Sequence, residues 1–240
     1  MKGIHYVPIV DPGVGMIWSA NEYFPLREGL KRNIFIMSPR VGIPLMGKVW
    51  PGDCYFPDFF HPNCGQYWED VMKYFYDQVP FSGIWLDMNE IASFVDGEIG
   101  SDIQGRRGDQ QHYLEKIYDS KHLHDPIHFV YNPGSRSQES MTICIFFFLG
   151  ELPPYIAMNA KHYGDLLEVN VHNIYNLAQE NATYQALKNV LDTPLPFILT
   201  RANFAGTGAF AAKWTGDNLA TWNFFKLSIP SLFFFNVLFF

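Results

Sequence analysis

Two aspartates in this chain follow short apolar segments and stand among aromatic residues. Asp87 lies in the segment Gly83-Ile-Trp-Leu-Asp-Met-Asn-Glu90, and Asp217 lies in Trp214-Thr-Gly-Asp-Asn218. Cleavage of a glycosidic bond requires two carboxylates, which different strands of a fold can bring to one site. We therefore take the two aspartates as candidate catalytic residues.

Asp87 directly follows Ile84, Trp85 and Leu86, which favour a buried strand. In parallel α/β barrels, catalytic side chains gather at the carboxyl ends of the strands. A carboxylate there can attack an anomeric carbon and form a covalent intermediate. The alternative is an aspartate that caps a helix. The flanking residues Trp85 to Glu90 favour the catalytic interpretation, because a cap does not need them.

Asp217 follows Trp214, which offers an apolar wall. Loss of solvation against such a wall raises the pKa of a carboxyl group, as a general acid requires. The alternative for Gly216-Asp217-Asn218 is a tight turn, since all three residues favour turns.

Three further residues are candidates for substrate contacts. Arg201 follows the apolar stretch that ends at Thr200, and it can hold a sugar hydroxyl or fix a catalytic carboxylate through two hydrogen bonds. A structural ion pair is the alternative. Trp50 and Phe94 are candidates for a sugar subsite, although loop aromatics also simply pack.

The composition of the 240 residues fits this chemistry. Aromatic residues make up 17% of the chain, which suits a carbohydrate cleft where rings lie against sugars. The net charge of −7 argues against a nucleic-acid partner. Of the three cysteines, Cys54 and Cys64 could form a bridge, but free buried thiols are expected.

Other chemistries lack their motifs. The chain contains no HExxH, no Gly-rich phosphate loop and no GxSxG. His122, His124 and His128 are close in sequence but lie in a polar stretch, so no metal site is expected. We expect no cofactor.

The first part of the chain predicts a strand, a helix and a second strand. The strand His5–Val10 is followed by a turn, and Tyr23–Pro57 is rich in Pro and Gly and is predicted to be loop-like. Apolar residues recur at helical spacing over Gly65–Gln78, and Gly83–Leu86 is the next strand. This order is typical of a parallel sheet.

The rest of the chain resumes this pattern after an irregular insertion over 96–158. A helix is predicted over about Leu166–Leu191, a strand over Pro196–Leu199, and another strand that ends at Trp214–Asn218. The apolar run Leu227–Phe240 is too short to cross a bilayer and is predicted to be a buried barrel strand rather than a membrane anchor.

The two acidic motifs resemble the two signatures of glycoside hydrolase family 31, the retaining α-glucosidases and α-xylosidases, and most of all the plant branch. The resemblance covers about 3–95 and 160–232. It includes four further segments: Val49–Gly52, Phe56–Phe59, Val171–Tyr175 and Pro196–Phe204. Asn170 departs from the pattern, because the family usually has an aspartate there.

The resemblance implies an α/β fold, a (β/α)8 TIM barrel, of which 1–240 would be a fragment running roughly from the third strand to the seventh. The expected function is retaining hydrolysis of α-glycosidic bonds at the non-reducing ends of glucosides. The alternatives are an inactive fragment with at most sugar binding, and α-xylosidase specificity. The expected partner is an α-linked oligosaccharide or glucoside, with no membrane and no nucleic acid.

The resemblance also implies roles for individual residues. Asp87 matches the nucleophile, Asp217 the general acid/base, and Glu90 a glutamate that supports the nucleophile. Arg201 matches an arginine that contacts the sugar. The positions that line the subsite of the cleaved sugar correspond to Trp50, Met88, Phe94 and Trp214.

The same resemblance implies a secreted, cell-wall or vacuolar location for a full-length enzyme, although no signal peptide is evident in MKGIHYVPIVDPG. The family's substrate-binding aspartate on an earlier strand and its histidine on a later one are not expected here. The stretch 135–155 resembles nothing in the family, and the ending 231–240 departs from the family pattern after Pro230. Such breaks suggest a truncated or mis-spliced gene model.

Overall fold

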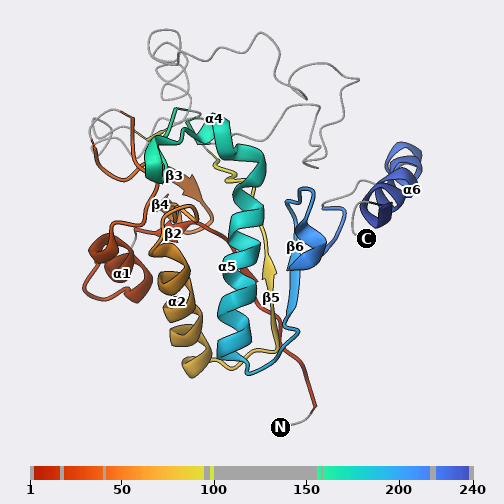
Figure 1. The fold of residues 1–240 in the computed structure, drawn as a ribbon, viewed down its shortest axis with the longest axis horizontal. Helices are drawn as coiled ribbons and strands as arrows, with labels where there is room; N and C mark the ends of the chain where they lie inside the picture. The colour runs from red at the N-terminus through yellow and green to blue at the C-terminus, as the bar shows by residue number, and fades with distance from the viewer. Residues whose placement is uncertain are drawn as a thin grey trace.

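The computed structural model describes residues 3–16, 19–39, 42–94, 98–99, 156–157, 159–216 and 220–237. In this part of the chain, two sheets are flanked by helices (Figure 1). The larger sheet has the strand order β1-β5-β6-β7, and all its pairs are parallel. Its strands are β1 (Ile9–Val10), β5 (Gly83–Leu86), β6 (Phe197–Thr200) and β7 (Ala212–Lys213).

The register of this sheet aligns the ends of its strands. Val10 is opposite Leu86, Leu86 is opposite Thr200, and Thr200 is opposite Lys213. Strand β5 confirms the strand predicted at Gly83–Leu86, and β7 confirms a strand just before Trp214. The strand predicted at Pro196–Leu199 is confirmed with its bounds one residue later. Of the predicted strand His5–Val10, only the last two residues form β1, although the carbonyls of Tyr6 and Pro8 accept hydrogen bonds from the N–H groups of Ser82 and Trp85.

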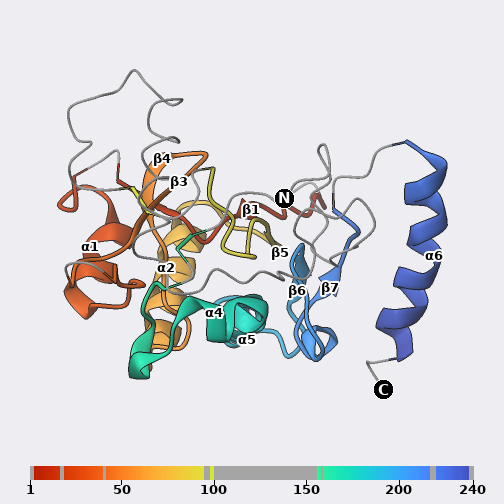
Figure 2. The same ribbon diagram turned by 90° about the horizontal axis from the view of Figure 1, so that it is seen from above.

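Two helices cover this sheet. Helix α2 (Cys64–Gln78) confirms the predicted helix and begins one residue before it. The predicted helix Leu166–Leu191 is divided into a short α4 (Glu168–Val171), the 3-10 helix η3 (His172–Ile174) and α5 (Tyr175–Val190). Figures 1 and 2 show α2 and α5 side by side on one side of β5.

The main core lies between these helices and the sheet. It is apolar on both partners, with Tyr67 and Met72 of α2, Leu187 of α5, and Ile84 and Leu86 of β5 fully or almost fully buried. The buried side chains of α2 recur three to four residues apart, which places them on one face of the helix. The indole N–H of Trp68 donates a hydrogen bond of 2.9 Å to the hydroxyl of Thr183 and so joins the two helices.

The prediction that Tyr23–Pro57 is loop-like was wrong. This region forms helix α1 (Phe24–Arg32), strand β3 (Met46–Val49) and strand β4 (Gly52–Tyr55). Pro25 lies in the first turn of α1, where its missing N–H costs nothing. Gly52 has φ +96° next to the turn of the β3–β4 hairpin. The Pro and Gly residues therefore start a helix and close a hairpin.

The second sheet is antiparallel, with the strand order β2-β4-β3, and β2 spans Val14–Gly15. Two further short 3-10 helices are η2 (Tyr163–Asp165) and η4 (Thr207–Ala209). A second apolar cluster under the hairpin includes Ile36, Leu45, Cys54, Phe56 and Tyr175. It connects the hairpin sheet with the start of α5.

The prediction of a strand over Leu227–Phe240 was also wrong. Helix α6 (Trp222–Val237) occupies most of this run, with Pro230 inside it, and it stands apart from the rest in both views (Figures 1 and 2). No strand of the described residues pairs with this run, and a helix satisfies its own backbone hydrogen bonds without a neighbour. None of the helices in the described ranges is long and apolar enough to cross a membrane.

Several sequence predictions fall outside the described residues. They are most of the insertion over 96–158, including the three histidines, Cys144 and the stretch 135–155. Cys54 and Cys64 are described, and both are free and buried, as predicted.

Candidate active site

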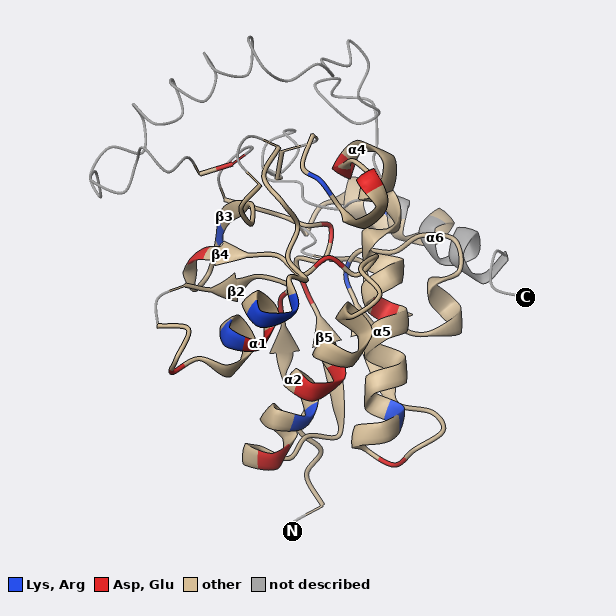
Figure 3. Ribbon diagram, turned by 60° about the vertical axis from the view of Figure 1, so that its left-hand side comes forward, with Lys and Arg blue, Asp and Glu red and all other residues tan. Residues whose placement is uncertain are grey.

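The candidate site lies where the parallel strands end. Because the register aligns the last paired residues, the next residue of each strand stands at the same edge of the sheet. Along that edge these residues are Asp11, Asp87, Arg201 and Trp214. In Figure 3, acidic and basic positions lie close together just beyond the end of β5.

Arg201 binds two carboxylates that follow β5. Its Nη1 lies 2.9 Å from Oδ1 of Asp87. Its Nε and Nη2 donate hydrogen bonds of 2.9 and 2.8 Å to the two carboxylate oxygens of Glu90. The side chain of Arg201 is only 5% exposed. One planar group thus orients the carboxylates of Asp87 and Glu90 together.

The backbone fixes Asp87 from two sides. Its N–H donates a 3.2 Å hydrogen bond to the carbonyl of Val10, and its Oδ1 accepts one of 2.9 Å from the N–H of Met88. Met88 and Ile91 have φ values of +53° and +58°, which are uncommon for residues other than glycine. No helix begins at this point, since a turn over Asn89–Ile91 and a β-bridge at Ala92 follow. The interpretation of Asp87 as a helix cap is therefore wrong.

A buried polar network joins the loop after Asp87 to β6 and α5. The side-chain N–H of Asn89 donates to the hydroxyl of Thr200 at 2.8 Å, and the N–H of Ala202 donates to Oδ1 of Asn89 at 2.9 Å. The hydroxyl of Thr200 lies 3.1 Å from a carboxyl oxygen of Glu180 in α5. Burial raises the pKa of Glu180 to about 7, although hydrogen bonds from Asn176 and the threonine hydroxyls oppose the shift.

Sequence reasoning missed Asp11, Asn89, Thr200 and Glu180 as parts of this site. Asp11 was taken only as part of a turn after β1. Its position directly after a predicted strand, like that of Asp87, was the signal that could have identified it. Burial is the largest cause that raises the pKa of Asp11 to about 6, and the neighbouring charge of Asp87 adds to it.

The three aromatic candidates lie in two ring pairs, one of which is completed by Trp85. Trp85 and Trp214 contact each other edge to face, with ring centroids 5.1 Å apart, at the carboxyl ends of β5 and β7. Trp50 and Phe94 form a second edge-to-face pair at 4.8 Å. Trp50 lies in the hairpin turn and is 76% exposed. The pair is therefore a surface feature of the hairpin, joined to the Asp87 loop by the hydrogen bond from the N–H of Phe94 to the carbonyl of Lys48.

The remaining candidates divide between buried and undescribed positions. Met88 is buried, with 4% of its surface exposed, and Ile91 beside it is fully buried. Asp217 lies outside the described residues. In the described ranges, no three His, Cys, Asp or Glu side chains are grouped to hold a metal ion.

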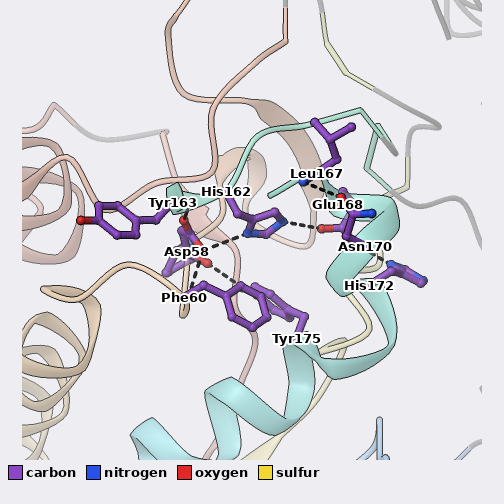
Figure 4. Close-up of polar contacts among 10 residues, drawn as sticks. Asp58, Phe60, His162, Tyr163, Leu167, Glu168, Asn170, His172 and Tyr175 are labelled. Atoms are coloured by element: carbon purple, nitrogen blue, oxygen red, sulfur yellow. Dashed lines mark hydrogen bonds and ion pairs between the residues drawn. The ribbon is translucent and has the colours of Figure 1, made fainter. Parts of the chain in front are cut away.

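We name Asp11, Asp87, Glu90 and Arg201 the strand-end cluster. A second buried polar cluster, the His162 network, consists of Asp58, His162, Glu168 and His172 (Figure 4). His162 lies between two carboxylates, with Nδ1 2.9 Å from Asp58 and Nε2 2.7 Å from Glu168. His172 contacts the other oxygen of Glu168 through Nδ1 at 2.6 Å.

Backbone groups complete the His162 network. The N–H of Phe60 donates to Oδ1 of Asp58, and the N–H of Tyr163 donates to Oδ2. Burial alone would lower the pKa of His162, but hydrogen bonds and charges from Asp58 and Glu168 raise it to about 9. His162 is therefore a buried cation at neutral pH, and it ties the segment after β4 to the segment before α5.

The sequence as a whole matches a family model described as the glycosyl hydrolases family 31 TIM-barrel domain, over residues 1–239. It is 35% identical to a lysosomal alpha-glucosidase of Rattus norvegicus over 238 residues, which are 98% of this chain and 21% of that protein. It is 33% identical over 242 residues to alpha-xylosidase 1 of Arabidopsis thaliana, covering 98% of this chain and 24% of that protein.

Solved structures agree with these matches. The alpha subunit of glucosidase II, in a Tris-bound crystal structure, is similar with a TM-score of 0.62 and 25% identity. The similarity covers 95% of this chain and 19% of that one. The family model and this neighbour support an α/β barrel fold. The chain thus spans about a fifth to a quarter of the length of these relatives.

Proposed function

Because the chain belongs to glycosyl hydrolase family 31, we propose that it carries the catalytic face of a retaining α-glycosidase. The reaction is hydrolysis of α-glycosidic bonds at the non-reducing ends of glucosides. One observation carries this proposal: Arg201 holds the carboxylates of Asp87 and Glu90 together at the carboxyl ends of two parallel strands. That edge is where enzymes with barrel folds place their catalytic groups.

In the proposed reaction, an oxygen of Asp87 attacks the anomeric carbon of the substrate. Asp217 gives its proton to the departing oxygen, so the leaving group departs as an alcohol and a covalent glycosyl-enzyme remains. Asp217 then takes a proton from water, which attacks the same carbon and releases Asp87. Two inversions leave the sugar with its original α configuration.

The other residues prepare this attack. Nη1 of Arg201 lies 2.9 Å from Oδ1 of Asp87 and so fixes the direction of that carboxylate. Glu90 holds the guanidinium in the plane that reaches Asp87. Arg201 is also proposed to contact the sugar. Trp50, Met88, Phe94 and Trp214 are proposed to line the subsite of the cleaved sugar, where rings pack against its C–H groups.

The proposal also fixes the place of the chain within a complete enzyme. We assign residues 1–240 to one catalytic (β/α)8 barrel, roughly from its third strand to its seventh, with an insertion over 96–158. Four parallel strands in the order β1-β5-β6-β7, with α2 before β5 and α5 before β6 in the chain, support this assignment.

Glucosides are the proposed substrates because relatives named as alpha-glucosidases are among the most similar proteins. Xylosides are the alternative, since alpha-xylosidase 1 is 33% identical. A second candidate function, sugar binding without hydrolysis, is favoured by the open sheet. Within the described residues, β1 and β7 pair on one side only, whereas a closed barrel has no edges.

The test is hydrolysis of para-nitrophenyl α-glucoside and α-xyloside by the chain and by Asp87→Asn. The substitution removes the nucleophile, so we expect kcat to fall by about 10⁴-fold or more. The control is Asp77→Asn, because Asp77 is exposed on α2 and pairs only with Lys73 among the contacts described. NMR of the first sugar released should show the α anomer. Equal activity of wild type and Asp87→Asn, or release of the β anomer, contradicts the proposal.

A further inference from the structure

A third carboxylate, Asp11, stands beside the proposed nucleophile. Asp11 follows β1 as Asp87 follows β5, and Val10 and Leu86 are opposite each other in the register. The N–H of Asp87 donates a hydrogen bond of 3.2 Å to the carbonyl of Val10, so the segments that follow β1 and β5 are still joined at this point. Neighbouring strands lie about 4.8 Å apart. Two carboxyl groups therefore start from adjacent positions on one edge.

The strand-end cluster contains one cation for three carboxyl groups. Arg201 already binds Asp87 through Nη1 and Glu90 through Nε and Nη2. The thiol of Cys54 in β4 is close enough to feel the charge of Asp11, but burial raises the pKa of this thiol to about 12, so it stays neutral. The described charged groups that act on Asp11 are therefore Asp87, Arg201 and Glu90.

One oxygen of Asp11 is buried without a hydrogen-bond partner. Oδ1 of Asp11 has almost no exposed surface and accepts no hydrogen bond from the described residues. A buried carboxylate oxygen with no donor is costly, and nearby negative charges add to the cost. Binding of a proton removes this cost, because a neutral carboxyl carries no charge and gains an O–H donor. The pKa of about 6 agrees with this geometry.

We propose that Asp11 is a positioning residue that carries a proton beside Asp87 during the reaction and presents a neutral carboxyl group to it. This inference rests on the proposed function of Asp87. A neutral Asp11 leaves Arg201 to Asp87 and Glu90, and its O–H can donate to a carboxylate next to it. An ionised Asp11 instead competes for Arg201 and repels Asp87. Ionisation of Asp11 therefore lowers kcat as the pH rises through about 6.

The direct test is an NMR titration of the 240-residue chain with isotope-labelled aspartate carboxyl groups. The carboxyl signals are assigned in the wild-type protein by through-bond correlation to the backbone. We expect the carboxyl carbon of Asp11 to titrate with a midpoint near pH 6. This measurement needs neither turnover nor a folded variant. A midpoint at the ordinary aspartate value of about 4 overturns the proposal.

The second test is the pH profile of hydrolysis in Asp11→Asn. The amide keeps the shape and the donor of the protonated carboxyl but cannot ionise. We expect the ratio of kcat at about pH 7 to kcat at about pH 5 to rise roughly tenfold over wild type. Asp53→Asn, at an exposed position of β4, is the matched control and should leave the ratio unchanged.

The outcomes separate the two proposals. A profile of Asp11→Asn that superimposes on that of the wild type overturns the role of Asp11 but leaves the proposed function intact. If the chain hydrolyses no α-glycoside while Asp11 titrates near pH 6, the proposed function fails. The protonation of Asp11 is then confirmed, but its proposed role in the reaction is overturned.

Discussion

The strand-end cluster and the His162 network are built on the same plan. In each, one buried cationic side chain lies between two carboxylates. In the strand-end cluster both carboxylates belong to one tight loop, and in the His162 network they come from distant parts of the chain. Arg201 joins Asp87 and Glu90, and His162 joins Asp58 and Glu168. Both clusters hold segments that are distant in sequence.

They differ in how completely their polar groups are satisfied. In the His162 network, Asp58 accepts two backbone N–H donors besides His162, and Glu168 is bound by His172 as well. In the strand-end cluster, Asp11 keeps a buried oxygen without a partner, and the backbone at Met88 and Ile91 is left-handed. A fully satisfied network stabilises a fold, whereas unsatisfied charge and strain in one place are typical of a functional site.

The largest expected effect comes from removal of the cation of the strand-end cluster. Arg201→Met leaves Asp87 and Glu90 buried without their partner, so we expect a loss of about 3–5 kcal/mol in the free energy of unfolding. Denaturation in urea measures this change. Hydrolysis should be lost as well, because Arg201 no longer orients the carboxylate of Asp87.

The matched control is Arg27→Met, since Arg27 is about half exposed and pairs with Glu28 on the surface of α1. Its loss should cost no more than about 1 kcal/mol. Equal destabilisation by the two substitutions would mean that the strand-end cluster contributes no more than a surface pair, and the comparison would fail.

The next largest effect is a pH dependence of stability that comes from the His162 network. Because the pKa of His162 is raised to about 9, its contribution to stability is present below the unfolded pKa of about 6.5 and is lost as the pH rises towards 9. The shift corresponds to about 3 kcal/mol over that window. Urea denaturation at several pH values should show this loss in wild type but not in His162→Gln.

The control for this window is His5→Gln, because His5 is exposed and contacts only Ser82 among the bonds described. It should keep the pH dependence of the wild type. A wild-type stability that stays constant between about pH 6.5 and 9 would show that His162 is not a buried cation.

The smallest effect on stability is expected outside both clusters. Trp50→Ala removes a ring that is 76% exposed and touches Phe94, so the free energy of unfolding should change by less than about 1 kcal/mol. If the ring lines a sugar subsite, KM should rise about fivefold, which equals about 1 kcal/mol of binding. Trp222→Ala, at an 84% exposed position of α6, should leave KM unchanged. An unchanged KM in Trp50→Ala assigns Trp50 to hairpin packing alone.

Local patterns in the sequence predicted the parts of the fold that depend on neighbours in the chain. The strand Gly83–Leu86 was predicted with its bounds, because a short apolar run ended at an acidic motif. Helix α2 followed from its spacing of apolar residues. The terminal run failed, because apolar residues alone do not distinguish a strand from a helix, and that depends on whether a partner strand is present.

The site was predicted only where its residues stood in a motif. Asp87 and Arg201 were candidates because of their motifs, but the hydrogen bonds that join Asn89, Thr200 and Glu180 beside them depend on the register between strands far apart in sequence. Asp11 needs the same register. The His162 network joins residues 104 positions apart, and no local pattern predicts such a contact.

The central claim is that Asp87 is the nucleophile at the end of β5. A fluorinated α-glucosyl fluoride forms the covalent intermediate but slows its hydrolysis, so the label stays on the residue that attacked. Mass spectrometry of the intact chain and of its peptides then identifies that residue. We predict one label, on the peptide that contains Asp87, and none in Asp87→Asn. A label on another carboxylate, such as Asp11, or equal labelling of Asp87→Asn would contradict the account.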